Sequence, residues 1–275
     1  MPSESSIFRH LLLVGLIGYS AASLAGAARL PFKADFENNA YTGWSTGKTP
    51  SMSIVKGGAN TGEYSVRAQM SGGGLTDNYK DYFFGDHGTV NGTPATGELW
   101  LKVASKVDSN FNFGSTAYHK IAIINFTEPS THRRRYQMII NLQRDTRQYF
   151  IENLKWNADG SFAYTVRGLS QNAANKPQFR PGQWDQLKMR IKPNTPGKND
   201  GIAQLWVNGQ LTMDYKDIPM RENTNLNPNV MIMSNYTYAS GTQWWADFYR
   251  GETDPETQHV ASPPMPPQIT AITPN

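Results

Sequence analysis

Residues 182–210 constrain the fold of this chain more than any other stretch. In residues 184–191, polar Gln186, Lys188 and Arg190 alternate with apolar neighbours, as in a strand with one buried face. A second strand-like run spans residues 201–207, and the turn-forming sequence PNTPGKND lies between the two. Asn208-Gly209 then favours a tight reversal after the second run. The segment therefore predicts antiparallel strands joined by hairpins.

Similar short runs recur along the chain, without a helical period. They cover residues 34–37, 53–56, 64–70, 98–107, 117–126, 135–143, 149–154, 162–169, 230–238 and 244–249. The run at 117–126 is the most apolar, so we expect it at the centre of a sheet. Short strands at regular spacing predict an all-β, two-sheet antiparallel sandwich, and 275 residues suit one such domain.

The sequence resembles a known superfamily at several places. The pattern G-x-W-x-x-L followed by W-V-N-G-x-L in residues 182–211, and D-F-E, G-W and G-x-Y-S-V-R in residues 35–67, resemble concanavalin A-like jelly rolls. That superfamily includes laminin-G-like modules, legume-type lectins and polysaccharide lyases. The strings E-L-W-L-K-V, N-F-N-F-G and Y-H-K-I resemble heparin-lyase-like polysaccharide lyases, over residues 34–250. The resemblance implies a jelly-roll sandwich that binds carbohydrate. The R-[ST]-E, Q-I-H and Y-F-K-x-G motifs of one alginate-lyase branch do not occur in the sequence.

The first 28 residues have the layout of a secretory signal peptide. Arg9 and His10 precede a short apolar run at residues 11–18, and Ala25-Gly26-Ala27 forms an A-x-A cleavage pattern. A membrane anchor is the alternative, but the run is shorter than the ~20 residues that span a bilayer. We expect a secreted or periplasmic protein with no membrane attachment after cleavage, a jelly-roll domain over residues 29–252 and a Pro-rich tail over residues 253–275.

Charge and cysteine content narrow the partners. The formal net charge is +4 and the pI about 9.1, which favours an acidic polysaccharide, although ordinary surface charge would give the same excess. Nucleic acid is not expected of an exported chain without a nucleic-acid motif. The sequence has no cysteine, which excludes disulfides, thiolate metal sites and a cysteine nucleophile. We expect a monomer.

The strands at residues 117–126 and 135–143 carry the polar residues of interest. In the second, alternation assigns Tyr136, Met138, Ile140 and Leu142 to the core and Arg135, Gln137, Ile139, Asn141 and Gln143 to the outer face. In the first, it separates Tyr118 and Lys120 from His119 and Asn125, and only one set can face a ligand. An ordinary solvated face is the alternative to a sugar-binding one.

Reaction types make different demands on these residues. Retaining glycoside hydrolysis needs two carboxylates about 5 Å apart. The E-x-D-x-x-E motif that supplies them in glucanases of this fold is missing from the sequence. A lyase must neutralise the uronate carboxylate, remove the C5 proton and protonate the leaving oxygen. Residue types assign carboxylate binding to Arg135, Gln137 and Lys120, acid and base roles to Tyr238 or His119, and subsite lining to Asn141, Gln143, Tyr236, Gln243 and Trp244.

The sequence therefore predicts a lyase acting on an acidic polysaccharide, with a non-catalytic lectin-like or laminin-G-like module as the alternative. No cofactor is required for that chemistry. The resemblance also implies a structural Ca²⁺ between the first and last strands, held by oxygen ligands. Asp35, Glu37 and Asp247 are the candidate ligands, and plain polar strand residues are the alternative.

Overall fold

The computed structural model describes residues 32–44, 47–48, 51–72, 79–83, 98–128, 130–235 and 237–257. These residues form strands and connecting turns and no α-helix, so the all-β prediction is confirmed. The strands are β1 (Phe32–Ala34), β2 (Gly47–Lys48), β3 (Met52–Lys56), β4 (Tyr64–Ser71), β5 (Tyr79–Phe83), β6 (Leu99–Val107), β7 (Tyr118–Thr127), β8 (Arg134–Gln143), β9 (Tyr149–Trp156), β10 (Phe162–Leu169), β11 (Asp185–Lys192), β12 (Gly201–Val207), β13 (Gln210–Ile218), β14 (Asn227–Ser234) and β15 (Ser240–Gly251).

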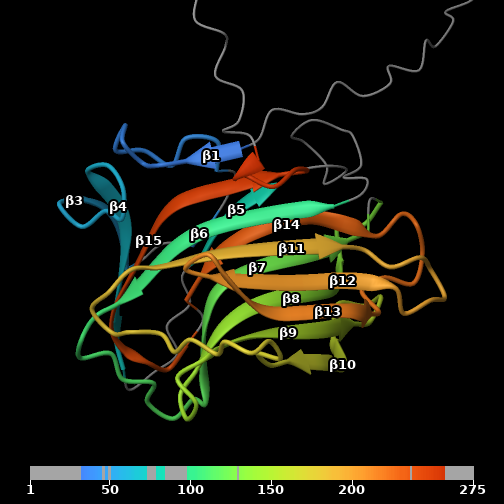
Figure 1. The fold of residues 1–275 in the computed structure, drawn as a ribbon. Helices are drawn as coiled ribbons and strands as arrows, with labels where there is room; N and C mark the ends of the chain where they lie inside the picture. The colour runs from blue at the N-terminus through green and yellow to red at the C-terminus, as the bar shows by residue number, and fades with distance from the viewer. Residues whose placement is uncertain are drawn as a thin grey trace, which may run out of the picture.

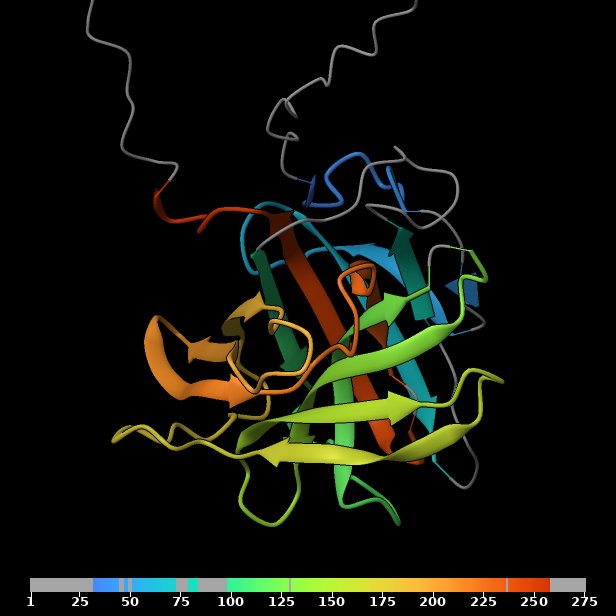
Figure 2. The same ribbon diagram turned by 90° about the vertical axis from the view of Figure 1, so that its right-hand side faces the viewer.

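The strands make two antiparallel sheets that stack face to face (Figures 1 and 2). One has eight strands in the order β13-β12-β11-β6-β15-β4-β3, with β1 also paired to β15. The other has seven strands in the order β10-β9-β8-β7-β14-β5-β2. Strand β7 occupies the middle of the second sheet, as its apolar sequence predicted. Many neighbours are distant in sequence, as in a jelly roll.

The hairpin predicted from residues 182–210 is present as β11 and β12, paired from Leu187 with Val207 to Lys192 with Ile202. Asn208 and Gly209 have φ angles of 51° and 79°, the left-handed backbone that a tight reversal into β13 requires. At the other end, the buried side chain of Asn194 accepts hydrogen bonds from the backbone of Met220 and Arg221. The turn is thereby tied to the segment that leads into β14.

The core lies between the two sheets and follows the alternation of the strands. On β8 the inward residues Tyr136, Met138, Ile140 and Leu142 all belong to the core, as predicted. On β6, Leu101 and Val103 point inward, while Lys102 and Lys106 lie on the outer face. Each sheet therefore has one outer face on which polar side chains are available to a ligand.

A β-bulge in β7 changes which residues share a face. The pairing with β8 shifts between Lys120 and Ala122, and Ile121 and Ala122 both enter the core. Simple alternation had grouped Asn125 with His119. The extra residue in the bulge reverses the alternation for the residues that follow it. Asn125 therefore lies on the outer face with Lys120, where its side chain accepts a hydrogen bond from Gln137 of β8.

A buried carboxylate joins the two sheets at one end of the sandwich. The hydroxyl of Tyr149 on β9 donates to Asp185 on β11 over 2.7 Å, and the amide of Asn208 donates to the other oxygen over 2.7 Å. Burial and the negative charge of Asp185 raise the pKa of Tyr149 well above its ordinary value.

The described part of the chain has no helix long and apolar enough to cross a membrane.

Candidate functional site

The candidate site lies on the outer face of the seven-stranded sheet, where β7, β8 and β9 run side by side. The register places Lys120 opposite Asn141, and Tyr118 opposite Gln143, across β7 and β8. Glu152 lies on the next strand, opposite Ile139. Directly paired residues share a face of an antiparallel sheet, so the five polar side chains project from the same side. We call this group the lysine cluster; it consists of Tyr118, Lys120, Asn141, Gln143 and Glu152.

Electrostatic contacts link the members of the lysine cluster. Burial raises the pKa of Glu152, and the positive charge of Lys120 and a hydrogen bond from Asn141 oppose that rise. Tyr118 is 39% exposed, and burial together with the charge of Glu152 raises its pKa. Its ring meets Phe150 edge-on, with centroids 5.7 Å apart. The cluster therefore places a cation, a carboxylate, a phenol and amides within reach of one another.

This arrangement suits proton transfer at a carbon next to a carboxylate. An ammonium and an amide can bind a carboxylate group and stabilise charge that develops on it. A carboxylate with a raised pKa is a better proton acceptor than an ordinary one, and a phenol with a raised pKa keeps its proton at neutral pH. The lysine cluster thus contains a binder, a base and an acid.

Gln137, predicted to bind a carboxylate, lies further along β8 and is buried. Its amide donates to Oδ1 of Asn125 over 2.8 Å. On β8, Ile139 lies between Gln137 and Asn141 on this face, and it packs with Ile123 and Leu154. The structure therefore does not bring Gln137 together with Lys120.

Arg135, predicted to bind the uronate carboxylate, is instead held by two carboxylates of the protein. Its guanidinium pairs with Glu128 and with Glu222, and its side chain is 15% exposed. Glu222 also binds Lys155, with 2.8 Å between Nζ and Oε2. The charge of Arg135 is therefore compensated within the protein.

His119 and Gln243, predicted as acid or base and as a subsite residue, lie between the sheets instead. Both are fully buried, and His119 Nε2 lies 2.6 Å from Gln243 Oε1. Burial lowers the pKa of His119 to about 4, so the ring is neutral near pH 7. Neither side chain reaches the outer face. On β7, His119 faces the core, as Ile121 does two residues later.

The remaining predicted residues lie on β15 and on the segment between β14 and β15. Trp244 lies on the outer face of the opposite sheet, where it pairs with Lys106 of β6. Tyr238 is 45% exposed in the bend between β14 and β15. Tyr236 lies outside the described residues. Trp244 is therefore not part of the lysine cluster.

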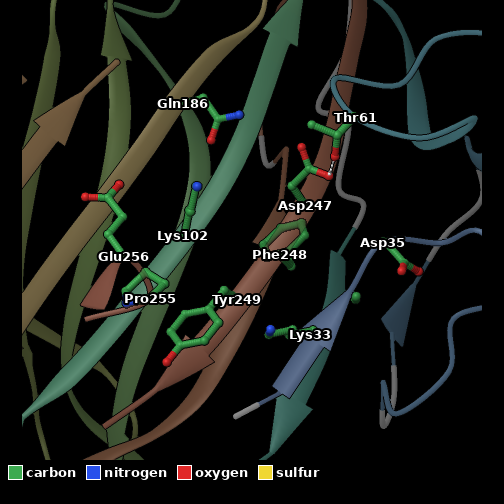
Figure 3. A pocket seen from close by; sticks show the side chains of 11 residues that line it. Lys33, Asp35, Thr61, Lys102, Gln186, Asp247, Phe248, Tyr249, Pro255 and Glu256 are labelled. Atoms are coloured by element: carbon green, nitrogen blue, oxygen red, sulfur yellow. Dashed lines mark hydrogen bonds between the residues drawn. The ribbon is translucent and has the colours of Figure 1, made fainter. Parts of the chain in front are cut away.

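The three predicted calcium ligands do not form one ligand set. Asp247 accepts hydrogen bonds from Asn60 and Thr61, and Glu37 accepts them from the backbone of residues 63 and 64. Asp35 and Asp247 line the same pocket, with Asp247 turned towards Thr61, but Glu37 is not among its lining residues (Figure 3). Among the residues that the structure describes, no three His, Asp or Glu side chains gather as a metal site. The residues in place do not fit the predicted calcium site.

Tyr118 and Glu152 are the members of the lysine cluster to which sequence reasoning gave no role. Tyr118 was assigned to the same face as Lys120, which the structure confirms. Glu152 could have been found by applying the same alternation to β9, where Phe150, Glu152 and Leu154 share a face. The pairing of β8 with β9 then brings that face beside Asn141.

Comparison with known proteins gives one family match and several structures of similar fold. Residues 168–250 match the family model described as polysaccharide lyase 14. A search of curated proteins found no match. The fold is similar to that of endo-β-1,4-glucuronan lyase from the fungus Trichoderma reesei, with a TM-score of 0.58 and 14% identity over 81% of this chain and 95% of that one.

Two further solved structures give the same result. Alginate lyase vAL-1 from Chlorella virus has a TM-score of 0.57 and 12% identity, over 82% of this chain and 100% of that one. The marine PL-14 alginate lyase from Aplysia kurodai has a TM-score of 0.56 and 11% identity, over 82% and 99%. At these identities the likeness shows the fold, and the family match adds the activity class. The resemblance to jelly-roll polysaccharide lyases is thereby confirmed, and the findings support a polysaccharide lyase.

Proposed function

We propose that this protein is a secreted or periplasmic lyase that cleaves a uronate-containing polysaccharide by β-elimination at the lysine cluster. The observation that carries the proposal is the register of β7, β8 and β9, which places Lys120, Asn141 and Glu152 on one outer face. The solved structures of similar fold are named as glucuronan and alginate lyases, and both of those polymers are built from uronates. The N-terminal signal-peptide pattern supports export.

In the proposed reaction, Lys120 binds the uronate carboxylate, while Asn141, which is fully buried, positions Glu152 through its hydrogen bond. The positive charge of Lys120 stabilises the extra electron density that the carboxylate acquires when C5 loses its proton. Glu152 accepts that proton, and the electron pair of the C5–H bond forms the C4–C5 double bond. The C4–O bond breaks, and Tyr118 donates its phenolic proton to the leaving oxygen. Solvent then returns both residues to their starting protonation states.

The decisive experiment follows ultraviolet absorbance during incubation of the mature protein with glucuronan, alginate, heparin, hyaluronan and pectate separately. Each β-elimination leaves a conjugated 4,5-unsaturated uronate at the new non-reducing end, so a rise identifies the reaction and the substrate together. Lys120→Ala should abolish the rise. Lys176→Ala, which changes an exposed lysine in a loop, serves as the matched control and should not alter it.

Two further variants test the assigned roles. Tyr118→Phe and Glu152→Gln each keep the shape of the side chain but remove the proton that is transferred or the group that accepts it. Both should lower kcat. A flat trace on every polymer, with retained binding to one of them, would instead establish a non-catalytic carbohydrate-binding module.

A further inference from the structure

The outer face of the eight-stranded sheet, on the opposite side of the sandwich, carries basic and aromatic side chains in adjacent rows. In the first row, Lys106 on β6 lies between two indoles. Its Nζ is 5.0 Å from the ring centroid of Trp184 and 4.5 Å from that of Trp244. Arg67 continues the row, because it pairs with Trp244 across β4 and β15.

A second row crosses the same face. Tyr249 on β15 pairs with Lys33 of β1 on one side and with Lys102 of β6 on the other. Lys188 lies beside Lys102 on β11, but Asp254 and Glu256 hold its ammonium. In the part of the chain that the structure describes, Lys33 and Lys102 have no carboxylate partner.

A pocket of about 340 Å³ opens between these two lysines. Figure 3 shows Lys33, Lys102 and Gln186 around it, with Tyr249 between the lysines. The buried Oε1 atom of Gln186 has no hydrogen-bond partner in the described structure. Glu256 also lines the pocket, and it shares the ammonium of Lys188 with Asp254.

The other carboxylates of the pocket lie at its far side. Asp247 bonds to Asn60 and Thr61, and Asp35 accepts a hydrogen bond from the backbone of Glu37. These two carboxylates therefore sit against the β3–β4 loop and the segment after β1, away from Lys102 (Figure 3). The side of the pocket formed by β6 and β11 therefore presents the ammonium of Lys102, with the unpaired amide oxygen of Gln186 beside it.

We propose that this face binds a chain of the acidic polysaccharide at a second, non-catalytic site. We call it the lysine–tryptophan face and define it by Lys33, Lys102, Lys106, Trp184, Trp244 and Tyr249. The ammonium groups pair with uronate carboxylates, the indole faces stack on sugar rings, and Gln186 accepts a hydrogen bond from a hydroxyl. The identity of the polymer rests on the proposed function.

The geometry makes this site separate from the lysine cluster. Lys102 projects from the outer face of one sheet and Lys120 from the outer face of the other, with the hydrophobic core between them. One sugar unit cannot contact both. A long polymer bound to the lysine–tryptophan face keeps further segments of the same polymer close to the lysine cluster. This raises their local concentration there, as in linked binding modules.

The test measures polymer binding in the Lys120→Ala background, where the substrate is not consumed. The double variant Lys33→Ala/Lys102→Ala is compared with Lys176→Ala/Lys198→Ala, which removes the same charge from exposed loop positions. Affinity electrophoresis in gels containing each uronate polymer, or a neutral glucan, gives the dissociation constants. We expect the first double variant to bind the acidic polymer at least tenfold more weakly and the control to bind unchanged.

Kinetics separate this site from catalysis. With Lys120 restored, Lys33→Ala/Lys102→Ala should lower kcat/KM on the long polymer and leave kcat/KM on a short oligosaccharide unchanged. Trp244→Ala should weaken polymer binding in the same way and report the stacking contribution. Far-ultraviolet circular dichroism and the melting temperature confirm that each variant is folded.

Each outcome decides one of the two proposals. Equal binding by the charge variants and their control would overturn the second site, even where the wild-type protein cleaves the polymer. Weaker binding by Lys33→Ala/Lys102→Ala, with no cleavage by the wild type, would support the lysine–tryptophan face and overturn the lyase. Equal loss of binding to the neutral glucan would also overturn the second site, because charge would then play no part.

Discussion

The two ends of strand β8 differ in how the protein uses its cations. At one end, the guanidinium of Arg135 forms ion pairs with both Glu128 and Glu222. At the other end Asn141 lies opposite Lys120, whose neighbouring carboxylate, Glu152, has its pKa raised by burial. Both cations were assigned to substrate binding by residue type. In the structure, two carboxylates of the protein pair with Arg135, whereas Lys120 interacts with Glu152.

This difference has a physical basis in desolvation and pairing. An arginine shared by two carboxylates has its charge compensated, and removing it leaves negative charges without a partner. A lysine beside one half-buried carboxylate can exchange that partner for a substrate carboxylate at a lower cost. The Lys120 end of β8 is therefore the one suited to catalysis, and the Arg135 end to holding strands together.

The largest expected effect comes from Lys120→Ala. Loss of the ammonium removes the charge that stabilises the developing carbanion, so kcat should fall by about a thousandfold, equivalent to ~4 kcal/mol. The measurement is the initial rate of ultraviolet absorbance increase at saturating polymer. A variant with near wild-type kcat would show that the comparison assigns catalysis to the wrong end of β8.

The next effect concerns His119, which lies beside Lys120 on β7 but faces the core. Its pKa is lowered to about 4 from an ordinary value of 6.5, so the unfolded state binds a proton more readily than the folded state. Its contribution to the free energy of unfolding is complete above pH 6.5 and is lost as the pH falls towards 4, by about 3 kcal/mol. Urea denaturation at pH 7 and pH 4 measures the loss.

His119→Gln provides the control for that titration. The variant is expected to be less stable at pH 7, yet its free energy of unfolding should change less between pH 7 and pH 4 than that of the wild type. Identical pH dependence in the two proteins would mean that the histidine does not titrate in this range. If His119→Gln also changed the pH dependence of kcat, His119 would take part in the reaction.

Arg135→Ala should lower the stability of the protein and leave turnover almost unchanged, whereas Lys120→Ala should lower turnover. Breaking the pairs with Glu128 and Glu222 should lower the free energy of unfolding by about 1–2 kcal/mol, since the groups are partly exposed and screened. Turnover should stay within about threefold of wild type, because Arg135 is outside the lysine cluster. Chemical denaturation and kcat are measured on the same preparation. A large fall in kcat with unchanged stability would restore the predicted substrate-binding role.

The sequence predicted the fold well because its signals there are local. Alternation within β8 identified the inner residues Tyr136 to Leu142, and Asn208-Gly209 identified the reversal after β12. The site was harder to predict because its decisive contacts are distant. Glu222 follows Arg135 by 87 residues, and Gln243 follows His119 by 124. The bulge after Lys120 has no marker in the sequence, so alternation failed at Asn125.

The smallest effect tests the edge of the lysine cluster. Gln143 lies opposite Tyr118, and its Oε1 already accepts a hydrogen bond from Thr146 over 3.0 Å. Only part of its hydrogen-bonding capacity is therefore available to a sugar hydroxyl. Gln143→Ala should raise KM by about threefold and leave kcat unchanged, because it removes binding that is equal in the ground and transition states. A fall in kcat comparable to that of Lys120→Ala would extend the catalytic residues along β8 to Gln143. No change in either kcat or KM would show that the lysine cluster ends at Asn141.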